Sequence, residues 1–239
     1  MTKPKSQVKS KQRVADRGEV FTAEREVKAM CDLVETQCDN VDATFLEPAC
    51  GDGNFLAEIL DRKLARVKKN AKSDATLWEW LSIRAVASLY GVDIMQDNVE
   101  ECRRRLFKQW DKAYKAACKK NCNEETRTSI QYILSKNIVC GNALTMMCVD
   151  ENQQDTDEYI TFAEFKTCGI KYMLKRRDFR LDVLLKANEK PKEQAQLTLG
   201  SDIDDIYNYL EINPETGDYM PKPLREYKPV HYERIKENG

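Results

Sequence analysis

A short stretch near residue 50 places acids and glycines where a strand is expected to meet a helix. Glu47 follows an apolar run that predicts a buried strand over residues 43–46. Gly51 and Gly53 permit backbone angles, and a close approach of a ligand, that a Cβ atom would prevent. Apolar residues then recur at helical spacing, so the first amide groups of the helix point back at the glycines. The stretch therefore predicts a site for an adenosine-containing ligand at the carboxyl ends of parallel strands, with an ordinary glycine turn as the alternative.

An acid and an amide follow two further apolar runs. Asp93 ends the second run, and a carboxylate there can accept hydrogen bonds from both hydroxyls of a ribose. It lies 40 positions after Gly53 (93 − 53), against the usual ~20, because an additional helix is expected between them. The alternative is an acid that caps the next helix. Asn142 follows the third run, where a side-chain amide can bind the edge of an adenine ring, and the alternative is a Gly-Asn turn.

Helical and extended patterns place these residues on an α/β framework. Apolar side chains at helical spacing predict helices over residues 23–34, capped by Thr22, and over residues 55–70, 76–88 and 98–119. Short apolar runs predict strands over residues 43–46, 89–94, 130–134 with 137–141, and 181–185, and a strand-like segment over residues 159–165. Strands that alternate with helices predict a doubly wound, parallel sheet.

Length and composition fit one large domain, or one domain with an appendage. The chain has 239 residues and 41% of them are hydrophobic, which is enough to build a core. We expect a basic flexible arm over residues 1–17, a main domain over residues 18–190 and an extended, proline-containing segment over residues 191–239.

Overall charge is nearly balanced, with 39 lysines and arginines against 40 aspartates and glutamates. Binding to nucleic acid must therefore come from local patches. Outside the N-terminal arm, the densest basic patch extends from Lys171 to Arg180 and contains Tyr172 and Phe179. It predicts either a nucleic-acid face or a solvated turn, and the sequence leaves both open.

Cysteine and histidine usage limits the chemistry further. Nine cysteines, an odd number, occur without a signal peptide, a transmembrane run or a Cys-x-x-Cys pair, which indicates reduced thiols in a cytoplasmic protein that does not contact membranes. The single histidine, His231, lies in the terminal segment. No metal site is therefore expected, and catalysis by histidine is disfavoured.

Several motifs, taken in order, resemble those of the adenine-specific (amino-methylating) DNA methyltransferases, especially the modification subunits of restriction-modification systems. The string Gly18-Glu19-Val20-Phe21-Thr22 is similar to their Gly-Glu-x-(Phe/Tyr)-(Thr/Ser) motif, although Ala23 stands where the family has proline. Residues 47–53 match their (Asp/Glu)-Pro-Ala-Cys-Gly-x-Gly signature. Residues 90–94 resemble their ribose-binding strand, and residues 141–144 resemble the loop at the adenine edge.

The resemblance implies a Rossmann-like fold that binds S-adenosylmethionine, with DNA as the expected partner. It places the first motif and the glycine loop at the methionine end of this cofactor, Asp93 at the ribose, and Ile94 and Asn142 at the adenine. The residues that it places around the cofactor are Phe21, Thr22, Glu47, Pro48, Ala49, Cys50, Gly51, Gly53, Asn54, Phe55, Asp93, Ile94, Asn142, Ala143 and Leu144.

The sequence departs from the family at the catalytic motif. Members carry (Asp/Asn/Ser)-Pro-Pro-(Tyr/Phe) after the fourth strand, where the motif binds the target amine and stacks on the flipped base. This chain has no Pro-Pro, and its nearest remnant, residues 182–191, offers only Asn188 as a catalytic candidate. About 50 residues follow, too few for the rest of the sheet and a target-recognition domain. The fold is therefore expected to be incomplete.

Two functions follow from this departure. The first is an S-adenosylmethionine-dependent DNA adenine methyltransferase, or its cofactor-binding part. The alternative is a non-catalytic module of a split or decayed methylase that acts with a partner subunit, which would supply catalytic or target-recognition elements. An unrelated nucleotide-binding dehydrogenase is disfavoured, because Glu47-Pro48-Ala49-Cys50 is foreign to dinucleotide fingerprints.

Overall fold

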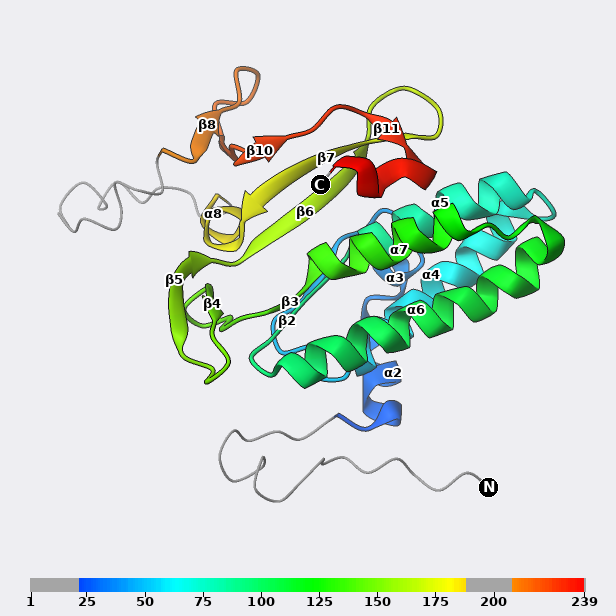
Figure 1. Cartoon of the computed structure of the whole chain (residues 1–239), viewed down its shortest axis with the longest axis horizontal. Coiled ribbons are helices and arrows are strands. Elements are labelled where there is room, and N and C mark those ends of the chain that lie inside the picture. The colour runs from blue at the N-terminus through cyan, green and yellow to red at the C-terminus, as the bar shows by residue number, and fades with distance from the viewer. Residues whose placement is uncertain (1–21, 188–207, 239) are drawn as a thin grey trace, which may run out of the picture.

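The computed structural model of the chain describes residues 22–187 and 208–238, and its elements form two regions (Figure 1). The first region alternates helices with parallel strands. Its elements are α2 (Glu24–Leu33), α3 (Glu35–Cys38), β1 (Phe45–Glu47), α4 (Asn54–Ala71), α5 (Ala75–Ala87), β2 (Leu89–Asp93), α6 (Gln96–Cys118), η1 (Lys119–Asn121), α7 (Glu124–Asn137) and β3 (Ile138–Cys140). The second region is mainly antiparallel. Its elements are β4 (Met147–Val149), β5 (Asp155–Tyr159), β6 (Thr161–Thr167), β7 (Met173–Arg180), α8 (Leu181–Lys186), β8 (Leu210–Ile212), β9 (Tyr219–Pro221), β10 (Arg225–Glu226), β11 (Val230–His231) and η3 (Tyr232–Asn238).

The strands of the first region form a parallel, three-stranded sheet in the order β1-β2-β3. Phe45 of β1 lies beside Leu89 of β2, and Gly91 of β2 lies beside Ile138 of β3. Helices α4 and α6 both contact β2, and their buried side chains share one core with those of α5 and α7. The fold is therefore mixed α/β, and the carboxyl ends of three neighbouring strands meet at one edge of the sheet.

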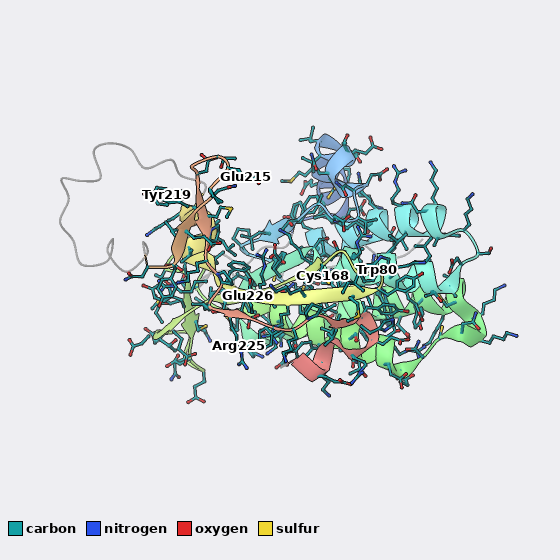
Figure 2. The ribbon with its side chains drawn as sticks, turned by 90° about the horizontal axis from the view of Figure 1, so that it is seen from above. Trp80, Cys168, Glu215, Tyr219, Arg225 and Glu226 are labelled. Carbon is teal, nitrogen blue, oxygen red and sulfur yellow. The ribbon has the colours of Figure 1, made fainter. Side chains whose placement is uncertain are left out.

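The second region centres on the long antiparallel hairpin of β6 and β7, which lies above the parallel sheet in the view of Figure 1. On its other side β7 pairs with β10 and β11, and Figure 2 shows Arg225 and Glu226 of β10 beside it. Tyr232 and Ile235 of η3 are 2% and 1% exposed and belong to the main core. The end of the chain therefore returns to the body of the protein.

Most of the predicted elements agree with this structure. The helices predicted over residues 23–34, 55–70, 76–88 and 98–119 are confirmed as α2, α4, α5 and α6. The strands predicted at residues 43–46, 89–94 and 137–141 are confirmed as β1, β2 and β3. The strand-like segment over residues 159–165 overlaps β6.

Two predicted strands are helical instead. Residues 130–134 belong to α7, whose N-cap Asn123 accepts a hydrogen bond from the Thr126 amide at 2.7 Å. Residues 181–185 form most of α8. Both predictions were wrong because periodicity does not separate a strand from a buried helix in so short an apolar run. The predicted cap of α2 was also wrong, because Ala23 and not Thr22 occupies that position, without a side-chain hydrogen bond.

Candidate functional site

The turn between β1 and α4, residues 47–54, is the glycine corner. Gly51 and Gly53 have φ angles of 52° and 85°, the left-handed conformation for which the sequence singled them out. The Gly53 amide donates to the Cys50 carbonyl at 2.8 Å, which closes the turn directly before α4. A Cβ atom on Gly53 would lie 2.6 Å from the Cys102 sulfur on α6. Glycine is therefore required at residue 53 by both backbone angle and space.

Hydrogen bonds join the ends of the three parallel strands. The Cys50 amide donates to the Val92 carbonyl at 2.8 Å, and the Gly51 amide donates to the Asp93 carboxylate (Oδ2) at 2.9 Å. On the other side of β2, the Gly141 amide donates to the Asp93 carbonyl at 3.0 Å. The loops after β1, β2 and β3 therefore form one continuous rim, with Asp93 at its centre.

The Asp93 carboxylate also fixes the start of α6. Its Oδ1 atom accepts hydrogen bonds from the Met95 amide at 2.8 Å and from the buried Asn98 side chain at 3.1 Å. The interpretation that this acid supports the start of the next helix thus has a counterpart in the structure, and its binding of a ribose stays a prediction. A carboxylate oxygen is a strong acceptor for hydroxyl groups.

Glu47 adds a second acid at the end of β1. Its side chain is half-buried, and burial raises the pKa of the carboxyl while the Ala49 backbone amide opposes that shift by hydrogen bonding to it. Pro48 and Ala49 are exposed on the outer side of the corner. Negative charge at this rim favours a cationic group over an anionic one.

Cys50 packs on the buried side of the glycine corner. Its side chain and that of Cys102 are buried, and a Cβ atom on Gly91 would lie 3.1 Å from the Cys50 sulfur. A hydrogen bond with the Cys102 thiol, together with burial, raises the pKa of Cys50. The thiol therefore stays protonated near neutral pH and has a packing role instead of a nucleophilic one.

Arg105 on α6 clamps the corner, a role that the sequence analysis missed. Its guanidinium donates to the Asn54 side chain at 2.6 Å and to the Asp52 carboxylate at 3.3 Å. The Asn54 amide in turn donates to the Thr22 carbonyl at 3.4 Å, so Thr22 lies at the corner as expected. The partners of Arg105 are 53 and 51 positions away in the chain, so no local sequence signal identifies the clamp.

Asn142 lies directly after β3, but its side chain holds its own loop. Its Oδ1 atom accepts a hydrogen bond from the Leu144 amide at 3.1 Å, and its Nδ2 atom donates to Asp155 at 3.0 Å. This is the turn that the sequence left open as an alternative. The Leu144 side chain is 93% exposed, whereas Ala143 packs against the smaller core cluster.

Of the remaining predicted site residues, the structure describes the positions of two and not of the other two. Ile94 is half-buried at the end of β2, and its carbonyl accepts a hydrogen bond from the Cys140 thiol at 3.6 Å. Phe55 packs against the main core beneath the glycine corner. Phe21 and Asn188 lie outside the described residues. The structure thus brings the three loops and Thr22 together at one rim and leaves the proposed catalytic asparagine without a described position.

Four basic side chains on β7 pair with acids of the same chain, whereas Lys171, in the turn before the strand, is exposed. The pairs are Lys175–Glu226, Arg176–Asp178, Arg177–Glu164 and Arg180–Asp182. Arg176 and Arg180 are only 5% and 6% exposed. Their positive charge is therefore used inside the fold.

Comparisons with family models, with curated proteins and with solved structures find no match for the chain. In the part of the chain that the structure describes, no three His, Cys, Asp or Glu side chains converge as a metal ion would require. Across those same residues, every helix is too short or too polar to cross a membrane. The motifs and the geometry of the rim are therefore the features that indicate a function.

Proposed function

We propose that the chain binds S-adenosylmethionine at the rim formed by the loops after β1, β2 and β3. The observation that supports this most is the Gly51–Asp93 hydrogen bond of 2.9 Å, which joins a left-handed glycine turn at a helix start to the acid at the end of the neighbouring strand. Adenosine-containing ligands bind at such strand ends in doubly wound sheets. The motifs of residues 18–144 support a Rossmann-like methyltransferase fold around this rim.

Each part of the rim has a task in this proposal. The ribose hydroxyls donate hydrogen bonds to Asp93, the carboxylate that accepts a hydrogen bond from the Gly51 amide in the structure. The amide groups at the start of α4 face the carboxylate of the methionine part, where the positive end of the helix dipole favours an anion. Glu47 provides negative charge for the cationic groups of the ligand. Ile94 and the loop at Asn142 border the adenine.

The proposed reaction is transfer of a methyl group to the exocyclic amine of an adenine in DNA, within a restriction-modification system. The amine lone pair attacks the methyl carbon, the carbon–sulfur bond breaks with its electrons going to sulfur, and the amine then loses a proton. Alignment of the two reactants and polarisation of the amine are what the protein must supply. Asn188 is the candidate for the second task.

A second candidate function is a cofactor-binding module that acts with a partner subunit. Two observations favour it: the sequence contains no Pro-Pro, and residues 181–186 form α8 where the family motif would follow a strand. In this case the partner supplies the groups that hold the target base. The module binds the cofactor but transfers no methyl group by itself.

Calorimetric titration with S-adenosylmethionine tests the shared part of both candidates. Asp93→Asn should weaken binding by about 1.5 to 3 kcal/mol, the usual contribution of a hydrogen bond to a charged group, which is roughly 10- to 150-fold. Asp157→Asn, in an exposed acid of β5, is the matched control and should bind like the unaltered chain. Absence of binding, or equal loss in both variants, would contradict the proposal.

Transfer of a radiolabelled methyl group to duplex DNA separates the two candidates. If the chain is a methyltransferase by itself, we expect labelled DNA with this chain alone and no labelled DNA with Asn188→Ala. If the chain is a cofactor-binding module, we expect it to bind the cofactor without labelling DNA. Label should then appear only when a subunit with an Asn-Pro-Pro-Tyr motif is added.

A further inference from the structure

Two neighbouring turns at the end of the helices farthest from the rim carry exposed lysines. Helices α4 and α6 both begin at the rim and run away from it, and Figure 1 shows both of their far ends at the right. The turns meet there, because the Cys118 thiol at the end of α6 donates to the Ala75 carbonyl at the start of α5 at 3.7 Å. The exposed lysines of these turns are Lys68, Lys69, Lys72, Lys119 and Lys120. We refer to them as the lysine tip.

The lysine tip has an unbalanced positive charge. None of its five ammonium groups forms an ion pair with a described residue. Asp74, the acid in the turn after α4, caps α5 and accepts a hydrogen bond from the Leu77 amide at 2.9 Å. At the start of α7, Glu124 pairs with Arg127, which leaves Glu125 as an acid without a described partner. Positive charge therefore exceeds negative charge around the tip.

Helix dipoles do not account for these lysines. The C-terminus of a helix carries about half a negative charge, which a nearby lysine offsets. Two helices end at the tip, but α5 and α7 begin there and contribute positive ends of similar size. The four dipoles therefore nearly cancel, and the charges of the five lysines remain for an external partner.

Lysine also occupies positions where the backbone favours glycine. Lys72 and Lys119 directly follow α4 and α6, with φ angles of 52° and 51° in the left-handed region. Glycine adopts such angles without a steric penalty and is the usual residue just after a helix, whereas a lysine is strained there. Strained residues of this kind concentrate at functional sites. Both turns thus place a lysine charge at a position where the fold alone favours glycine.

The side chains around the tip indicate the chemistry of its partner. Among the described residues, the exposed large apolar side chains all lie outside the two turns, so none is placed to insert into a lipid bilayer. Trp78 and Tyr114, the aromatic residues nearest to the turns in the chain, are 3% and 0% exposed and cannot stack on unpaired bases. Lysines bind phosphates as point charges. These features fit the backbone of a duplex nucleic acid.

We propose that the lysine tip binds the phosphate backbone of duplex DNA and holds the protein on DNA independently of the cofactor. Helix α4 has 18 residues, so at 1.5 Å per residue the tip lies about 27 Å from the glycine corner. The DNA at the tip is therefore a different stretch from one whose adenine would enter the rim. The choice of DNA over RNA rests on the proposed function, whereas the phosphate backbone follows from the lysines.

The test is the fluorescence anisotropy of a short, labelled DNA duplex that is titrated with the full chain, without S-adenosylmethionine, at several salt concentrations. The variant Lys72→Gly with Lys119→Gly removes two phosphate contacts. It should lower the affinity about tenfold at low salt and make the slope of log K against log salt shallower by about 2. Because glycine relieves the strain at both helix ends, the melting temperature of this variant should rise. A loss of binding is then not a loss of the fold.

A double variant elsewhere on the surface is the matched control. Lys222→Gln with Lys236→Gln removes the same charge from two exposed lysines outside the tip, and should leave the affinity and the slope unchanged. The bases of residues 1–17 are present in every variant, so their contribution is the same in each comparison. Calorimetric titration should give the tip variant the unaltered affinity for S-adenosylmethionine. Failure at the tip is therefore distinguishable from failure at the rim.

Four results would overturn the proposal. The first is an equal loss of affinity in the control, which would mean attraction by overall charge. The second is an unchanged salt slope in the tip variant. The third is tighter, tip-dependent binding of duplex RNA. The fourth is tighter, tip-dependent binding of phosphatidylserine vesicles or of polyglutamate, which would assign the tip to a membrane or to an acidic protein.

Discussion

Arginine holds carboxylates in both regions of the molecule, but with opposite exposure. At the glycine corner, the Arg105 side chain is 31% exposed and contacts Asp52 at 3.3 Å, beside a turn whose backbone amides face the rim. On β7, Arg176 and Asp178 form a doubly hydrogen-bonded pair at 2.7 Å, and the arginine side chain is 6% exposed. The first arrangement borders solvent, and the second is sealed in the fold.

Tyrosine rings also contact the arginines of β7. Arg180 lies 3.6 Å from the ring centre of Tyr159 and 4.5 Å from that of Tyr209, and the ring of Tyr227 lies 4.3 Å from Arg176. Tyr209 and Tyr227 belong to the C-terminal part of the chain. These cation–π contacts therefore fasten that part to β7. The two regions therefore differ in how their arginines are held: the pairs around β7 are buried in the fold, whereas the arginine at the glycine corner is partly exposed.

The largest expected effect is on stability, from breaking the sealed pair. Arg176→Met leaves the Asp178 carboxylate buried without its cation and should lower the free energy of unfolding by about 3 to 5 kcal/mol, measured by urea denaturation. Lys175 is on the same strand as Arg176 but forms an exposed pair with Glu226 of β10. Lys175→Met should therefore lower the free energy of unfolding far less. Equal losses in the two variants would contradict the distinction between sealed and exposed pairs.

Two glycines with similar backbone angles separate strain from space. Gly53→Ala and Gly217→Ala both place a Cβ atom at a positive φ, 85° and 74°, and each should cost about 1 to 2 kcal/mol of strain. At Gly53 the Cβ atom also meets the Cys102 sulfur, whereas nothing lies within 4 Å of it at Gly217. Gly53→Ala should therefore lower the melting temperature more and also abolish binding of S-adenosylmethionine. Equal melting temperatures and retained binding would contradict this account of the corner.

A smaller effect is expected from the exposed clamp. Arg105→Met removes the donors to Asp52 and Asn54 and should weaken S-adenosylmethionine binding several-fold, with little loss of stability. Arg104→Met is the matched control, because that neighbouring side chain pairs with Glu101 on the outer face of α6. Calorimetric titration of both variants checks the prediction, and a loss of affinity in the control alone would contradict it.

The smallest effect concerns pH and Glu47. Burial raises the pKa of this carboxyl, so it becomes protonated at a higher pH than an exposed glutamate, whose pKa is about 4.3. Affinity for the cationic ligand should therefore fall as the pH drops through this raised value, and Glu47→Gln should remove that step. Titrations at several acidic pH values measure it. A step of the same size in Glu47→Gln would assign it to another group.

The sequence predicted elements and conformations that depend on neighbouring residues. Helices with a long apolar stripe were found because the stripe repeats over many residues. The left-handed angles of Gly51 and Gly53 are ones that glycine permits at no steric cost, as the sequence predicted for this turn. The short runs at residues 130–134 and 181–185 were assigned wrongly, because tertiary packing and a cap outside the run decide their structure.

Contacts between segments that are far apart in the chain could not be predicted from local sequence patterns. Glu164 lies opposite Arg177 only because of the β6–β7 register, and Arg225 of β10 pairs with Asp178 of β7 across 47 positions of the chain (225 − 178). The ion pairs of the basic patch on β7 could therefore not be predicted from the sequence. One signal was present: Arg176 and Asp178 alternate in a strand pattern, which places them on the same face.

The central claim is that the glycine corner binds S-adenosylmethionine, and selective ¹⁵N labelling of glycine tests it most directly. The chain has nine glycines, and Gly51 and Gly53 lie in the corner while Gly169 and Gly217 lie in open turns. On titration with S-adenosylmethionine, the account predicts saturable shifts of the Gly51 and Gly53 amide signals, with Gly169 and Gly217 unmoved. Stationary Gly51 and Gly53 signals at saturating ligand would contradict it.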